Sequence, residues 1–353
     1  MEKRNESIWI NFEQLLDGHP NIIHLPCVNK LFEISYEKRL QYLEGKELLI
    51  EIAAQMLGYF HSKYEDIICA ADQSNGIRFC MDKQGGFIHG LLIDAEDFID
   101  HLRVQFQGIA KVRSFGHLLK VCAAAYSGCI GRKREAGCGN YREYWLLYHM
   151  HQVNVDFEES NRCFQAEFNR IENLMIIREP VQHLHSWIRT AVIKEKWGVR
   201  NGKEGIFTHI LRSEMGIILR NSGIKNVTVV RFEDLKYRTE KILKSLCKWL
   251  GIPYLNVLLS TTENGIEVYF PSYSENGVCY ITGNDTTAAD RKDFSDVFTV
   301  WDEARLNTIY AKFKSAYGYE NDVPAFTEFS QEFLKQILNL HLLCKRRLRD
   351  GQM

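Results

Sequence analysis

The 353-residue chain is predicted to fold as a helix-rich α/β protein with a mostly parallel central sheet flanked by helices. Two short runs, 173–177 (NLMII) and 225–230 (KNVTVV), are apolar, β-branched at several positions, and followed by a polar loop and a helical pattern. Buried parallel strands have this character because helices cover both faces of their sheet. Apolar residues at three- and four-residue spacing predict helices over Leu31–Phe60, Ala95–Phe106, Glu158–Arg170, Glu204–Asn221 and Thr239–Leu250.

Weaker patterns complete the predicted elements. Asn21–Leu25 and Asp66–Ala71 are further strand candidates. Gly128–Asn140 contains four glycines together with Arg132, Lys133 and Arg134, which predicts a mobile basic loop. Such a loop either steers an anionic ligand or is simply a solvated surface segment.

The chain is expected to form one domain over residues 1–320 and a helical tail over 321–353, because no Pro- or Gly-rich linker interrupts it. The tail has an apolar face followed by basic residues: Phe329, Phe333, Ile337, Leu340, Cys344, then Lys345, Arg346, Arg347 and Arg349. Such a helix packs on its own domain or on a second subunit of a homo-oligomer, and less commonly lies on a membrane surface.

Composition excludes several classes of protein. Lys and Arg (44) nearly balance Asp and Glu (45), so nucleic acid is not an expected partner. The ten cysteines form no CxxC pair and no zinc-type Cys/His spacing, which predicts reduced thiols and no metal. Met1–Leu16 lacks a secretory apolar core, and no apolar run approaches the roughly 18–20 residues of a membrane span. A cytoplasmic location is therefore expected.

Arg178 and Ser186 stand out in the segment 174–187, LMIIREPVQHLHSW. A strand delivers Arg178 at its carboxyl end, Pro180 turns the chain, and the following helix carries Ser186 eight residues after the arginine. Ligands of open α/β sheets bind at this end of the strands, and arginine can contact a phosphate through two hydrogen bonds. The same two residues also suit a purely structural role, as a strand-end arginine and a helix-face serine.

The run 177–187 (IREPVQHLHSW) resembles the 3′-phosphate-binding motif of sulfotransferases that use 3′-phosphoadenosine-5′-phosphosulfate (PAPS). The resemblance implies a P-loop-like sulfotransferase fold in which Arg178 and Ser186 contact the 3′-phosphate of the donor. It also implies transfer of a sulfuryl group to a hydroxyl or amine of a carbohydrate or small metabolite. Glu179 departs from the Asn or Asp that is common at its position in the family.

Two later blocks resemble the same family. Val229–Leu235 (VVRFEDL), the helix 237–250 and the close Gly251–Pro253 are similar to a strand, helix and L-G-I ending of these enzymes. Glu233 and Asp234 lie just past the strand, where a structural role is expected. Arg291 and Lys292 resemble the basic segment that covers the 3′-phosphate, although Asp293 follows instead of the usual glycines.

The region that should hold the phosphosulfate departs most from the family pattern. Leu15–Ile23 resembles the helix end and turn after the phosphosulfate loop, which places that loop on residues 7–10, SIWI. Only Ser7 suits an anion, because Ile8 lacks the backbone freedom of glycine and the next two side chains offer no hydroxyl. A catalytically impaired or truncated nucleotide-binding protein is therefore the alternative to an active enzyme.

The base that would accept the proton of the acceptor is not assigned by the sequence. Four histidines lie in suitable segments: His149, His151, His183 and His185. A kinase-type phosphate loop, G-x-x-x-x-G-K-[ST], is missing from the chain, which disfavours that class.

Overall fold

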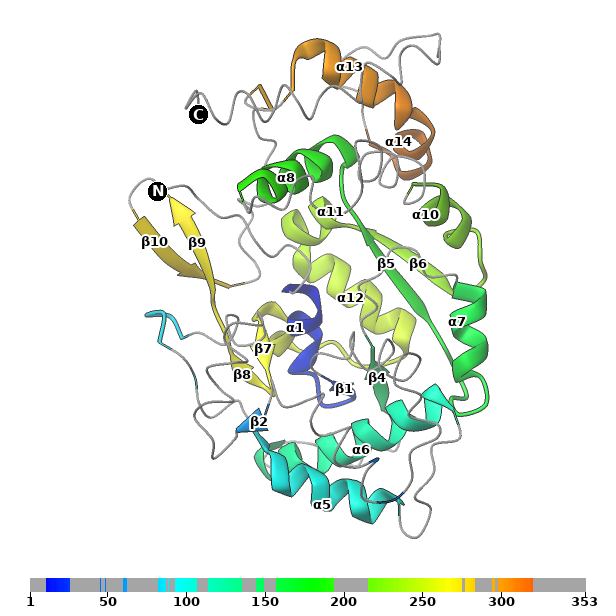
Figure 1. The fold of residues 1–353 in the computed structure, drawn as a ribbon, viewed down its shortest axis with the longest axis vertical. Helices are drawn as coiled ribbons and strands as arrows, with labels where there is room; N and C mark the ends of the chain where they lie inside the picture. Colours follow the sequence, from blue (N-terminus) through cyan, green and yellow to red (C-terminus); the bar gives the residue numbers. More distant parts are fainter. Residues whose placement is uncertain are drawn as a thin grey trace.

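The computed structural model of the protein describes residues 11–25, 45, 48, 60–61, 82–86, 88, 93–106, 114–134, 144–148, 157–193, 215–274, 277–282, 294–295 and 298–319. The helices are α1 (Asn11–Asp17), α5 (Ala95–Phe106), α6 (Phe115–Arg134), α7 (Phe157–Phe164), α8 (Pro180–Ile193), α10 (Met215–Asn221), α11 (Phe232–Tyr237), α12 (Thr239–Leu250), the 3₁₀ helix η6 (Asn256–Leu259), α13 (Val300–Ile309) and α14 (Ala311–Tyr317). The strands are β1 (Ile22–His24), β2 (Phe60–His61), β3 (Ile93–Asp94), β4 (Trp145–Leu147), β5 (Asn173–Ile177), β6 (Val227–Arg231), β7 (Thr262–Glu263), β8 (Ile266–Glu267), β9 (Phe270–Ser274) and β10 (Gly277–Ile281). Helices predominate over strands (Figure 1).

The strands of the described residues pair two by two. The pairs β1–β4, β2–β3 and β5–β6 are parallel, whereas β7–β8 and β9–β10 are antiparallel. The fold is thus a helix-rich α/β arrangement, as the sequence predicts. The expected single central sheet is seen in this part of the chain as separate small pairs.

The pair β5–β6 is covered on both faces, which explains why its strands are apolar at most positions. Its register runs from Asn173 opposite Val227 to Ile177 opposite Arg231. Leu174 and Ile176 join the core that contains Leu243 of α12. The alternate residues of β5 pack with Phe313 of α14 on the other side. Both predicted strands are confirmed, with the second displaced to 227–231.

Helix α1 and strand β1 connect the first part of the chain to its later part. Leu15 and Leu16 pack in the same core as α12, and His19 lies 2.7 Å from the carbonyl oxygen of Pro253. Strand β1 runs parallel to β4, and the Trp145 indole donates a hydrogen bond to the carbonyl of Leu250 (3.0 Å). The first strand candidate is therefore confirmed over Ile22–His24.

The helices α5 and α6 pack against each other around a separate core (Figure 1). Helix α6 continues to Arg134, so the prediction of a loop beginning at Gly128 is wrong for residues 128–134. Gly128 serves close packing: a Cβ atom at this position would lie 2.0 Å from Cδ2 of His101 on α5. Absence of a side chain, rather than turn formation, explains this glycine. Residues 135–140 lie outside the described ranges.

Several predicted helices differ in their bounds. Helix α12 spans Thr239–Leu250 as predicted and ends at Gly251, whose φ of 76° is left-handed. Helix α7 ends at Phe164 rather than continuing to Arg170. The predicted helix 204–221 is described only from Met215. Of the predicted helix 31–60, Gly45 and Leu48 are described as helical, whereas Phe60 lies in strand β2, so the prediction is wrong at that residue.

Three further predictions lie outside the described residues: the strand candidate 66–71, the tail 321–353 and the boundary between domain and tail. No helix within the described ranges is both long and apolar enough to cross a membrane.

Candidate functional site

Arg178 and Ser186 come together at the carboxyl end of β5. Arg178 is the first residue after the strand, and α8 begins two residues later at Pro180. The guanidinium Nη1 lies 3.5 Å from the Ser186 hydroxyl oxygen, at the long limit of a hydrogen bond. Arg178 is only 6% exposed. The structure therefore places the two predicted residues side by side, with the cationic group buried.

Glu179 starts helix α8. Its backbone carbonyl accepts the first helical hydrogen bond, from His183 (2.9 Å), and its carboxylate accepts the backbone N–H of Gln182 (2.6 Å). This is the N-cap geometry that Asn or Asp commonly provides, and Pro180 occupies the first helical position, where its missing N–H costs nothing. Glu179 thus performs with a longer side chain the capping that its position requires.

A buried lysine holds Glu179 from the opposite side. The Nζ atom of Lys314 on α14 lies 2.8 Å from Glu179 Oε1 and donates to the side-chain oxygen of Asn307 (2.7 Å). Lys314 is 4% exposed, so its charge is compensated within the protein. The start of α8 is therefore fastened to α13 and α14.

Glu233 ties the ends of the two parallel strands together. Its Oε1 accepts the backbone N–H of Glu179 (2.9 Å), and its Oε2 accepts the Tyr319 hydroxyl (2.9 Å). Burial and the nearby Glu233 raise the pKa of Tyr319 above its ordinary value, so this hydroxyl remains a donor. These contacts give Glu233 the structural role expected for it. The neighbouring Asp234 forms an ion pair with Arg231 (2.6 Å), which links the last residue of β6 to the first turn of α11.

Two buried cations approach one aromatic ring. The Cζ atom of Arg178 lies 5.2 Å from the centroid of the Phe232 ring, and Nζ of Lys236 lies 5.4 Å from it. Lys236 is 5% exposed. Sequence reasoning missed Lys236, although Phe232, Leu235 and Lys236 follow the i, i+3, i+4 spacing of one buried helix face.

Positive and negative side chains lie close together at the carboxyl end of β5 and shift the pKa values of their neighbours. Burial lowers the pKa of Arg178, while the carboxylates of Glu233 and Glu179 oppose that shift. Loss of hydration and the charge of Arg178 lower the pKa of His183 to about 4. At neutral pH the site thus combines buried cations with a neutral imidazole.

The four candidate bases separate into different environments. His185 is 1% exposed and packs against the rings of Phe294 (4.9 Å) and Phe298 (5.9 Å), as a core residue does. The charge of Arg178 acts on His183, which places this candidate near the predicted site. His149 and His151 lie outside the described residues, as do Ser7, Arg291 and Lys292.

A second titratable cluster joins α1 to the β7–β8 hairpin. His24 lies between Glu13 (3.3 Å) and Asp17 (3.7 Å), and Asp17 also accepts the hydroxyl of Thr262 (3.1 Å). Burial raises the pKa of Glu263, and His24 nearby opposes the rise. No motif pointed to this cluster, because its members are up to about 250 residues apart along the chain.

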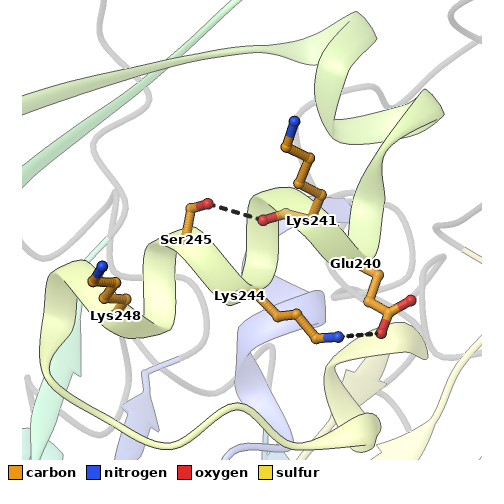
Figure 2. A pocket seen from close by; sticks show the side chains of 5 residues that line it. All are labelled: Glu240, Lys241, Lys244, Ser245 and Lys248. Atoms are coloured by element: carbon orange, nitrogen blue, oxygen red, sulfur yellow. Dashed lines mark hydrogen bonds and ion pairs between the residues drawn. The ribbon is translucent and has the colours of Figure 1, made fainter.

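The outer face of α12 carries a different set of cations. A shallow groove there is lined by Glu240, Lys241, Lys244, Ser245 and Lys248 (Figure 2). Lys244 pairs with Glu240 (2.6 Å), and both side chains are more than half exposed. We name this groove the α12 lysine surface. Its charged groups are exposed, so solvent weakens the ion pair between Lys244 and Glu240.

Comparison with known proteins adds little to this description. No protein-family model matches the chain, and no curated protein matches it. Among solved structures, the sulfotransferase domain from the curacin biosynthetic pathway is similar, with a TM-score of 0.40 and 12% identity over 88% of this chain and 93% of that one. A TM-score this low carries no argument about function, which rests on the residues themselves.

Proposed function

We propose that the protein binds PAPS and acts as a sulfotransferase, with Arg178 and Ser186 holding the 3′-phosphate of the donor. The observation that supports this most is the 3.5 Å approach of the two side chains at the carboxyl end of a parallel strand. Ligands bind at that end in open α/β sheets. The acceptor in this proposal is a hydroxyl or amine of a carbohydrate or small metabolite.

The local donor set suits a phosphate monoester. Arg178 offers several N–H donors in one plane, Ser186 offers a hydroxyl, and the buried Lys236 adds positive charge near the same ring. A phosphate dianion in a poorly hydrated site gains more from such groups than a single carboxylate would. Because Arg178 is 6% exposed, neighbouring side chains have to move aside as the phosphate enters.

The other proposed contacts follow the resemblance of the sequence. Arg291 and Lys292 would cover the same phosphate, and Ser7 would donate to the 5′ end of the donor. Glu179 and Glu233 act as positioning residues, because both oxygens of each carboxylate have protein partners that hold the start of α8 against the end of β6.

Calorimetry with two nucleotides tests the proposal. Adenosine 3′,5′-bisphosphate should bind to the unaltered protein. Arg178→Gln should reduce its binding free energy by about 1.5–3 kcal/mol, the contribution of a hydrogen bond to a charged group. Adenosine 5′-phosphate, which lacks the 3′-phosphate, should be affected much less. Lys248→Gln on the α12 lysine surface is the matched control and should change neither affinity. Equal losses for both nucleotides in Arg178→Gln would contradict the assignment.

A second candidate function is nucleotide binding with little or no transfer. Residues 8–10 (IWI) stand where the resemblance places glycine and hydroxyl groups, so few donors are available for charge on the transferring sulfuryl group. Removal of one such donor commonly costs a factor of about 10² to 10³ in rate. A radiolabelled-sulfate transfer assay with mixed carbohydrate and metabolite acceptors separates the two functions. Robust turnover supports the enzyme, and binding without turnover supports this alternative.

A further inference from the structure

Three side chains with metal-binding atoms meet between α5 and α6, the helical pair at the bottom of Figure 1. Asp97 and His101 lie four residues apart on α5, so they project from the same face of that helix. Cys129 comes from α6. A ligand atom from each of the three lies within 4.8 Å of the ligand atoms of the other two.

A hydrogen bond to its own helix fixes the His101 ring. Its Nδ1 lies 3.0 Å from the backbone carbonyl oxygen of Asp97. A carbonyl oxygen can only accept, so Nδ1 donates its proton and Nε2 carries the lone pair. This is the arrangement found in metal-binding histidines, whose second nitrogen is held by a carbonyl or carboxylate.

Gly128 allows the imidazole to approach α6 closely. A Cβ atom at this position would lie 2.6 Å from Nε2 and 2.0 Å from Cδ2 of His101, closer than two such atoms can be. Because the glycine has no side chain, Nε2 reaches the backbone of α6 directly beside Cys129. The helix crossing therefore brings nitrogen and sulfur donors together from two elements.

We propose that Asp97, His101 and Cys129 form a zinc site, with water as a fourth ligand. Thiolate, imidazole and carboxylate are the donors that Zn²⁺ takes, whereas Ca²⁺ and Mg²⁺ prefer oxygen alone. The side chains of Asp97 and His101 are 47% and 34% exposed, so they can shift to the bond lengths of roughly 2.0–2.3 Å that zinc requires. Cys129 binds the metal as a thiolate, so its thiol releases one proton to solvent for each metal ion bound.

A metal in this place would fasten α5 to α6. The two helices share their own core, and a ligand that binds only the folded arrangement stabilises it. The site lies apart from Arg178 and takes no part in the proposed nucleotide binding. Its failure would thus leave the proposed function unaffected, and the reverse also holds.

Cobalt substitution tests the site. Tag-free, reduced and chelator-treated protein is titrated with Co²⁺ and then with Zn²⁺. We expect one Co²⁺ per chain, with a thiolate-to-cobalt charge-transfer band in the near ultraviolet that Zn²⁺ removes. Cys129→Ser should abolish that band. Asp97→Asn and His101→Gln lie at partly exposed positions and should retain the fold. Each should weaken Co²⁺ binding by about 10- to 100-fold or more, since even the loss of a group that only supports a ligand costs that much.

Two variants separate this site from other metal-binding groups of the chain. Cys122→Ala removes the other described cysteine of α6 and should leave the band unchanged. Gly128→Ala keeps all three ligands but displaces the imidazole, so it should weaken Co²⁺ binding while circular dichroism still shows a helical protein. The absence of a stoichiometric thiolate band in the unaltered protein would overturn the proposal, and so would a band that persists in Cys129→Ser.

Discussion

The carboxyl end of β5 and the outer face of α12 both gather cations, and they differ in what surrounds the charges. Arg178 and Lys236 are 6% and 5% exposed, lie over one aromatic ring, and stand near Glu179 and Glu233. On the α12 lysine surface the side chains extend into solvent, and the ion pair there joins residues one helical turn apart.

Burial therefore decides what each set of cations can do. At the strand end, water is largely excluded, so each charge interacts strongly with its neighbours and with any anion that enters. On α12, water and salt screen the charges, which leaves weak and unspecific attraction. Four predictions test this difference, in order of decreasing effect, and two of them compare matched residues of the two regions.

Loss of a carboxylate should have the largest effect. Glu233→Ala removes the acceptor for the Glu179 N–H and the Tyr319 hydroxyl and leaves Arg178 less compensated. Breaking such a network costs about 3–5 kcal/mol of unfolding free energy. Glu240→Ala on the α12 lysine surface should cause no measurable change. Urea unfolding of both variants tests the contrast, which fails if the two lose similar stability.

The pH dependence of stability should report on His183. Its pKa is about 4 in the folded protein against an ordinary value of 6.5, so the unfolded chain binds the proton more tightly. The contribution of neutral His183 to the free energy of unfolding is fully present above pH 6.5. It is lost as the pH falls from 6.5 to about 4, and the loss is at most about 3 kcal/mol. His183→Gln should flatten the urea-unfolding profile over this interval. An unchanged profile in His183→Gln would show that another group causes the pH dependence.

Two serines provide a smaller contrast. Ser186→Ala removes a hydroxyl at the strand end and should weaken the binding of adenosine 3′,5′-bisphosphate by about 1.5 kcal/mol, the lower end for a hydrogen bond to a charged group. Ser245 instead donates to the carbonyl of Lys241 within α12 (3.0 Å), so Ser245→Ala should leave the affinity unchanged. Calorimetry under identical buffer conditions compares the two. Equal effects would remove Ser186 from the phosphate site.

The smallest effect is expected for the exposed lysines. Replacing Lys241 and Lys248 together by Gln should not measurably change nucleotide affinity at about 0.15 M salt, where charges farther apart than about 8 Å are screened. Calorimetry at low and at moderate salt provides the measurement. A large loss at moderate salt would place the nucleotide on the α12 lysine surface instead.

The sequence predicted those features that depend on neighbouring residues. The apolar run of β5, the proline that starts α8 and the eight-residue spacing from Arg178 to Ser186 are local, and the structure contains all three. A strand and the helix after it have few alternative geometries, so a short motif fixes the relation between these two side chains.

Features that depend on packing between distant segments were missed. Gly128 looked like a loop residue because glycine disfavours helices, yet the approach of His101 from α5 explains it within α6. Lys236 was not singled out by any motif, yet it is 5% exposed and its Nζ lies over the ring of Phe232. For Gly128 the decisive partner belongs to a tertiary contact that no local pattern contains. Phe232 and Lys236 are one turn apart on α11, so their i, i+4 spacing does indicate the contact between them.

Helix α1 contacts residues about 250 positions later in the chain, and this separation has a consequence during protein synthesis. Gln14 contacts Glu263, 249 residues later, and Asp17 holds Thr262 and the N–H of Gly265. At roughly 5–20 residues per second, these partners leave the ribosome roughly 10–50 s after α1 does. Throughout that interval Leu15 and Leu16 lack part of the core that later buries them, so the nascent chain exposes an apolar segment until α12 and the β7–β8 hairpin have been made.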